Sequence, residues 1–65
     1  METIYTYNSK NDGAVLAVVS DGKFYYVVDL QANERWSGSY DNYADADAVA
    51  VQYMDNTYGS DNWTY

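Results

Sequence analysis

The alternation of apolar and polar residues is clearest in residues 41–57, DNYADADAVAVQYMDNT, and it predicts an amphipathic helix there. Apolar side chains recur at spacings of three and four residues, which places them on one face of an α-helix. The predicted apolar face carries Ala46, Val49, Ala50, Tyr53 and Thr57. Asn42 is a suitable N-cap residue, and Gly59 is placed to end the helix in a left-handed conformation.

Four shorter stretches before this helix predict β-strands, because they are rich in β-branched, aromatic and other apolar residues. They are residues 3–7, 14–19, 23–30 and 34–37. The dipeptide Asp21-Gly22 separates two of them, and a two-residue Asp-Gly loop between apolar runs favours a type I′ hairpin. The pattern therefore predicts an α+β fold in a single domain, residues 1–65. An antiparallel β-meander of three to four strands packs against one α-helix.

The expected hairpin determines which side chains share a face of the sheet, since alternate residues point to opposite faces. A tight turn places Val19 opposite Phe24. One face then carries Val15, Ala17, Val19, Phe24, Tyr26 and Val28. We expect the helix to cover this face, because Lys23 and Asp29 lie at the ends of the other one. The other face carries Leu16, Val18, Tyr25 and Val27.

These four residues form an apolar surplus for which the chain offers no obvious cover. One interpretation is that the C-terminal segment or the tyrosines of residues 3–7 shield them. The other is that they form a homodimer face or a docking surface for a partner.

The composition excludes several kinds of chemistry. The chain has neither cysteine nor histidine, which removes disulfides, thiolate nucleophiles, imidazole bases and ordinary zinc sites. Asp45 and Asp47 point about 200° apart on a regular helix and cannot chelate one ion together. The turns NSKNDG and DNTYGSDN lack the full pattern of a calcium loop. We therefore expect no enzymatic activity, no metal and no cofactor.

Targeting signals are also missing from the sequence. No apolar run approaches the roughly 20 residues of a membrane span. The start, METIYTYNSK, lacks the features of a signal peptide. We therefore expect a cytoplasmic protein.

The charge balance is the strongest global feature of the chain. Ten acidic residues oppose three basic ones, and the net charge is −7. All three bases lie in the first 35 residues, and residues 36–65 contain five aspartates and no cation. Direct binding to nucleic acid or to an anionic membrane is disfavoured, because both need a basic surface. The expected partner is instead a basic protein surface.

The expected partner-binding surface consists of acids on and around the helix, together with a tyrosine among them. Its residues are Asp41, Asp45, Asp47, Asp55, Asp61 and Tyr43. Carboxylates interleaved with aromatic hydroxyls suit a groove whose lysines and arginines normally hold phosphates. Such a surface can compete with nucleic acid for the groove.

In size, acidity, absence of cysteine and the helix DNYADADAVAVQYMD, the chain resembles small phage-encoded inhibitors of host defence. These include anti-CRISPR and anti-restriction proteins that mimic DNA. The resemblance implies an acidic inhibitor in the host cytoplasm, a monomer or weak homodimer. Its partner would be a DNA-binding subunit of a CRISPR surveillance complex, and it would block recognition of target DNA or of the PAM. The resemblance is one of class and assigns no role to an individual residue.

Two other functions are compatible with the same sequence. In the first, the chain is a small structural or interaction domain that dimerises or docks through the apolar sheet face, and its acids serve only solubility. In the second, the tyrosines form a small ligand-binding module. Mimicry predicts binding that depends on salt and on the helix acids, whereas docking predicts dependence on Val18 and Tyr25.

Overall fold

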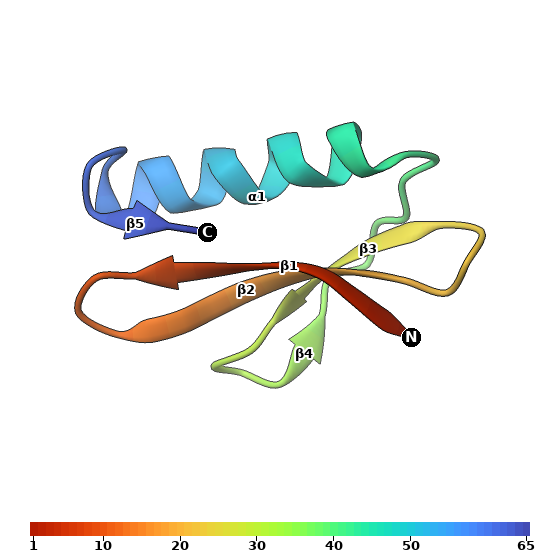
Figure 1. Cartoon of the computed structure of the whole chain (residues 1–65), viewed down its shortest axis with the longest axis horizontal. Helices are drawn as coiled ribbons and strands as arrows, with labels where there is room; N and C mark the ends of the chain where they lie inside the picture. Colours follow the sequence, from red (N-terminus) through yellow and green to blue (C-terminus); the bar gives the residue numbers. More distant parts are fainter.

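The computed structural model describes all 65 residues and confirms an α+β fold, with one helix packed on an antiparallel sheet (Figure 1). The elements are β1 (Glu2–Ser9), β2 (Gly13–Ser20), β3 (Tyr25–Asp29), β4 (Glu34–Arg35), α1 (Tyr43–Tyr58) and β5 (Trp63–Thr64). The strand order is β4-β3-β2-β1-β5. The sheet has one strand more than the largest number expected, because the C-terminal β5 pairs with the end of β1.

Helix α1 begins and ends close to the residues that the sequence indicates. The Asn42 side chain accepts a hydrogen bond from the Asp45 backbone N–H at 3.0 Å, which satisfies one of the free donors of the first turn. Gly59 ends the helix with its N–H donating to the Asp55 carbonyl at 2.9 Å. The φ of Gly59 is positive, at 92°, but its ψ of 149° lies outside the left-handed helical region that was expected.

The buried face of α1 is rotated from the one that the periodicity predicts. Its fully buried residues are Ala46, Ala50 and Met54, spaced four apart. Val49 and Tyr53 are only partly buried, and Thr57 is exposed. The helix is turned so that Asp47, expected on its flank, comes to lie partly buried against the sheet.

The turn between β2 and β3 is longer than the Asp-Gly loop predicts. Val19 pairs with Tyr26, and Ser20 pairs with Tyr25, so residues 21–24 form the loop. Asp21 Oδ1 accepts hydrogen bonds from the backbone N–H groups of Lys23 and Phe24, both at 2.9 Å. The predicted register is therefore wrong by two residues. Because the error is an even number, the other paired residues of β2 and β3 keep their predicted faces. Val15 does not, because the pairing with β1 shifts there from Leu16 to Ala14, and its side chain is buried in the core cluster with Leu16 instead of facing away with Ala17.

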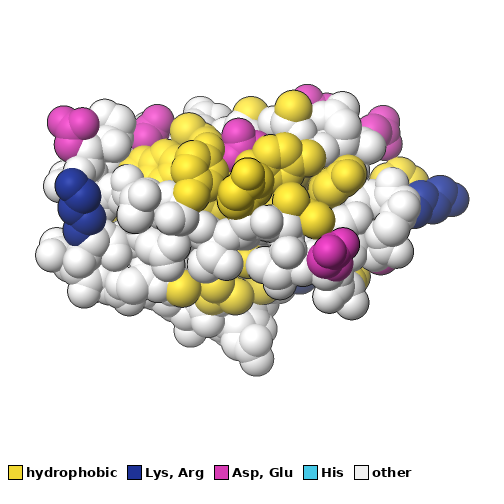
Figure 2. Space-filling model, in the orientation of Figure 1, with side chains coloured by type: hydrophobic (Ala, Val, Ile, Leu, Met, Phe, Trp, Pro, Cys, Tyr) yellow, Lys and Arg dark blue, Asp and Glu magenta, His cyan; other side chains and the backbone are white.

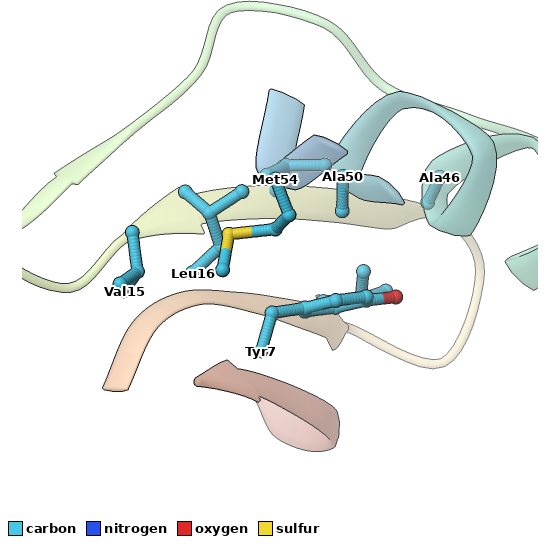
Figure 3. Close-up of a cluster of buried hydrophobic side chains, with 8 residues drawn as sticks. Tyr7, Val15, Leu16, Ala46, Ala50 and Met54 are labelled. Carbon is cyan, nitrogen blue, oxygen red and sulfur yellow. The ribbon is translucent and has the colours of Figure 1, made fainter. Parts of the chain in front are cut away.

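The helix covers the sheet face that carries Leu16, Val18, Tyr25 and Val27, which was expected to have no cover from the helix. Leu16 is fully buried in the core beneath α1 (Figure 3). Val18 and Val27 are fully buried in the same core, and Tyr25 packs against it. The assignment of the helix to the opposite face is wrong, and Leu16, Val18 and Val27 are covered by α1 rather than exposed to a second copy or a partner.

Two features explain why this face is the covered one. Lys23 lies in the turn outside β3, and Asp29 at the end of β3 accepts hydrogen bonds from the N–H groups of Gln31 and Ala32, so neither charge enters the core. In addition, β1 places Tyr7 opposite Leu16, which adds a large aromatic ring to the same face. Burial of the larger apolar area is favoured.

The opposite face of the sheet carries Tyr26 and Val28, both partly buried, in alternation with the core residues of β3. The Arg35 guanidinium lies 4.6 Å from the centre of the Tyr26 ring. Lys23 lies similarly over Phe24, at 5.4 Å. Two of the three basic side chains of the protein therefore rest on aromatic rings, one on this face and one in the loop between β2 and β3.

Candidate functional site: a carboxylate among tyrosines

Asp47 accepts more hydrogen bonds from tyrosine hydroxyls than any other acidic residue of the chain. One of its oxygens, Oδ1, accepts hydrogen bonds from three tyrosine hydroxyls: Tyr7 at 2.6 Å, Tyr43 at 3.1 Å and Tyr65 at 3.1 Å. The three tyrosines come from β1, from the first turn of α1 and from the residue after β5. The carboxylate thus joins segments that are far apart in the sequence.

The local sequence explains how each donor reaches this point. Tyr43 precedes Asp47 by four residues, and side chains at this spacing lie on the same side of a helix. Ala46 and Ala50 are small and fully buried, and the Tyr7 ring extends past them along the underside of the helix (Figure 3). Tyr65 is carried in by β5, whose two residues pair with Asn8 and Ser9 of β1.

The aromatic rings around Asp47 also contact one another. We call Tyr5, Tyr7, Tyr43 and Tyr65 the tyrosine cluster. Within it the ring centres of Tyr5 lie 5.4 Å from those of both Tyr43 and Tyr65, and those of Tyr7 and Tyr65 are 5.2 Å apart. All three pairs are tilted, an arrangement that is favourable for aromatic rings.

The cluster has a buried side and an open side. Tyr7 is fully buried, whereas Tyr5 is 48% exposed and Tyr65 is 55% exposed. Figure 2 shows hydrophobic side chains gathered in a band across the front of the molecule, below a row of acidic side chains along its upper edge. The exposed rings of β1 and of the C-terminal residue therefore form a surface that a partner can reach.

The three tyrosines that donate to Asp47 have raised pKa values. Burial, followed by the hydrogen bond to Asp47, raises the pKa of Tyr7 far above its ordinary value. The same two causes raise the pKa of Tyr65 to about 12. The pKa of Tyr43 is also raised, mainly by burial. At neutral pH these hydroxyls therefore keep the protons that they donate to the carboxylate.

The other acids of the expected partner-binding surface lie elsewhere. Asp45 belongs to the helix N-terminus, where its carboxylate accepts from Asn42 Nδ2 at 3.3 Å. Asp55 accepts from Trp63 Nε1 at 2.7 Å. Asp41 and Asp61 are exposed just before and just after the helix. Helix α1 has 16 residues, so these acids are spread along about 24 Å.

The structure therefore joins Asp47 and Tyr43 in one site and leaves the other four acids exposed along the helix. Tyr5, Tyr7 and Tyr65 belong to the site but were not predicted from the sequence. A signal for the first two was available, because Tyr5 and Tyr7 alternate in a predicted strand and so share one face. No feature of the sequence indicated that Tyr65 lies beside them, because that depends on the pairing of β5 with β1, two strands far apart in the chain.

We also looked for surface hollows and metal sites elsewhere in the molecule. Its one surface hollow is lined by Met1, Glu2, Ser20, Asp21 and Gly22, none of which belongs to the tyrosine cluster. No group of three or more acidic residues lies close enough together to hold a metal ion. No helix is long and apolar enough to cross a membrane. No protein-family model, curated protein or solved structure matches the chain.

Proposed function

We propose that the protein binds a basic groove of a nucleic-acid-binding protein and competes there with DNA. The partner class that we favour is a DNA-binding subunit of a host defence complex, such as a CRISPR surveillance complex, in which the inhibitor blocks recognition of target DNA or of the PAM. Phosphates make duplex DNA densely negative along its axis, and proteins that bind it present matching lysines and arginines. An acidic domain with a negative edge suits the same groove.

The observation that supports this proposal most is the row of exposed carboxylates along α1. Asp41, Asp45, Asp55 and Asp61 are all exposed, and the segment that carries them, residues 36–65, contains no lysine or arginine. In Figure 2 acidic side chains lie along the upper edge, where Figure 1 shows the helix, and basic side chains lie toward the two ends of the molecule. Such a field steers association with a cationic surface and is screened by salt.

The proposal is tested by competition with DNA. Purified surveillance complexes are titrated with fluorescently labelled target duplex in the presence of the protein, and the anisotropy of the duplex is recorded at low and high salt. We expect the wild-type protein to displace the duplex, more weakly as salt increases. The double variant D41K/D61K should lose about tenfold in apparent affinity, because charges that faced a basic groove are reversed.

The matched control is E2K/E34K. It changes the net charge of −7 by the same amount, but its exposed residues lie in β1 and in β4. Asp41 and Asp61 are chosen because they lie outside α1, whereas Asp45 and Asp55 take part in hydrogen bonds within the fold. Equal losses of apparent affinity in both variants would show that only the net charge matters and not the position of the acids. Absence of competition with any of the complexes would exclude this class of partner.

A further inference from the structure

The open side of the tyrosine cluster has properties that the row of helix acids lacks. It combines two exposed aromatic rings, Tyr5 and Tyr65, with a carboxylate at their inner edge, because Tyr65 donates to Asp47 and packs on Tyr5. Only four large hydrophobic side chains of the protein are substantially exposed, and these are two of them. Exposed aromatic side chains gathered at one place are typical of binding hot spots.

Asp47 carries a charge for which the fold provides hydroxyl donors and no cation. Its Oδ1 accepts all three hydroxyl hydrogen bonds, and its Oδ2 takes part in none of them. Of the three basic side chains, Arg35 rests on Tyr26 and Lys23 rests on Phe24. A partly buried carboxylate gains from a cation that arrives with a partner, because neutral donors compensate its charge only in part.

We propose that the surface formed by Tyr5, Tyr65 and Asp47 receives an arginine side chain of a partner protein. The guanidinium stacks on an exposed tyrosine ring and directs its N–H groups to Asp47. The proposal shares a cationic partner with the proposed function, but it depends on different residues and on a different face of α1.

Two observations favour a guanidinium over an ammonium group. The rings of Tyr5 and Tyr65 pack on each other at 5.4 Å and form a surface rather than an enclosing box, so a planar group that stacks fits better than a compact one that must be surrounded. In the fold itself the guanidinium lies closer to a ring than the ammonium does, since Arg35 lies 4.6 Å from the centre of the Tyr26 ring and Lys23 lies 5.4 Å from that of Phe24. Arginine offers several donors in one plane, which suits simultaneous contact with a ring and a carboxylate.

The probes that test this are an oligo-arginine peptide and an oligo-lysine peptide of the same length, which carry equal charge. Binding is followed by two-dimensional NMR of the whole protein at low salt. For the wild type we expect the arginine peptide to bind about threefold or more tightly than the lysine peptide, with the largest signal changes at Tyr5, Asp47 and Tyr65. Signal changes confined to Asp41, Asp45 and Asp55 would overturn the proposal.

Variants then separate the two surfaces. Y5A/Y65A should lose the preference for arginine while it keeps its affinity for lysine, and D47N should weaken arginine binding without loss of the fold. The control Y26A removes a ring from the opposite face of the sheet and should keep the preference. An unchanged preference in Y5A/Y65A would overturn the proposal.

The test also distinguishes this proposal from the proposed function. In D41K/D61K both peptides should bind more weakly while their ratio is kept. If D41K/D61K binds both as the wild type does, the role of the helix acids fails, and the role of the tyrosine cluster is judged on Y5A/Y65A alone.

Discussion

Tyr7 and Leu16 lie opposite each other on β1 and β2, and both are fully buried beneath the same helix, yet α1 meets them in different ways. Leu16 lies under Met54, with Val15 beside it, and offers only apolar surface (Figure 3). Tyr7 extends past Ala46 and Ala50 and ends in a hydrogen bond of 2.6 Å to Asp47. The contact at Leu16 only buries apolar surface. The contact at Tyr7 does so too, and its hydrogen bond also fixes the distance and direction between the hydroxyl and the Asp47 carboxylate.

This difference explains the rotation of the helix. Burial of apolar surface is non-directional, so several rotations of α1 about its axis would cover Leu16 comparably well. The hydrogen bonds from Tyr7 and Tyr43 to Asp47 can form at far fewer rotations of the helix, because hydrogen bonds weaken quickly with distance and angle. We conclude that the apolar contact supplies most of the stability and that the polar contact selects one arrangement.

The largest effect is expected at the apolar contact. L16A removes a fully buried side chain, and it should lower the free energy of unfolding by about 2–5 kcal/mol, from lost burial and the cavity left behind. Urea unfolding followed by circular dichroism measures the loss. The matched control is L30A, the same change at a side chain that is 41% exposed, which should cost about 0.5 kcal/mol or less. Similar losses in the two variants would contradict the position of Leu16 in the core.

A smaller effect is expected at the polar contact. Y7F keeps the buried ring and removes the hydroxyl that donates to Asp47, and it should cost about 1.5–3 kcal/mol, the range for hydrogen bonds to charged groups. Y53F is the control, because the Tyr53 ring packs on Trp36 away from Asp47. The double variant Y7F/D47N sharpens the comparison. Its loss should be less than the sum of the single losses, whereas simple additivity would show that the two groups do not interact.

The apolar pattern was sufficient to predict the α+β class, and local side-chain chemistry explains why the predicted turn and the predicted covered face are wrong. Periodicity located the helix and the main strands, and with them the α+β class. The Asp-Gly dipeptide indicated a two-residue turn, but Asp21 and Ser20 form hydrogen bonds within a longer loop. The covered face was predicted wrongly because Lys23 and Asp29 lie at the edge of that face and do not enter the core, while the ring of Tyr7 adds apolar area to it.

The candidate site was predictable only in part. Asp47 and Tyr43 could be chosen from the sequence because charge and spacing along one helix are local properties. The inward orientation of Asp47 was not predictable, because the carboxylate accepts hydrogen bonds from hydroxyls of β1 and of the residue after β5. Tyr7 and Tyr65 are 58 positions apart in the numbering, and only the pairing of β5 with β1 brings them together.

The smallest effect at neutral pH is expected for Tyr65, whose ring is 55% exposed and whose hydrogen bond water can replace. Its contribution should instead appear as a dependence on alkaline pH. Because the folded pKa of about 12 lies above the ordinary 10.0, the folded state holds the hydroxyl proton more tightly than the unfolded state does. This stabilisation is complete below about pH 10 and is lost as the pH rises through about 12.

Unfolding by urea at several pH values between about pH 8 and about pH 11 therefore compares the two contacts directly. The stability of the wild type should fall above about pH 10, and that of Y65F should fall less steeply, because one of the tyrosines with a raised pKa is gone. V18A, which changes only the apolar contact, should give a curve parallel to that of the wild type. A Y65F curve parallel to both would mean that the hydroxyl of Tyr65 does not contribute to the hydrogen bonds at Asp47.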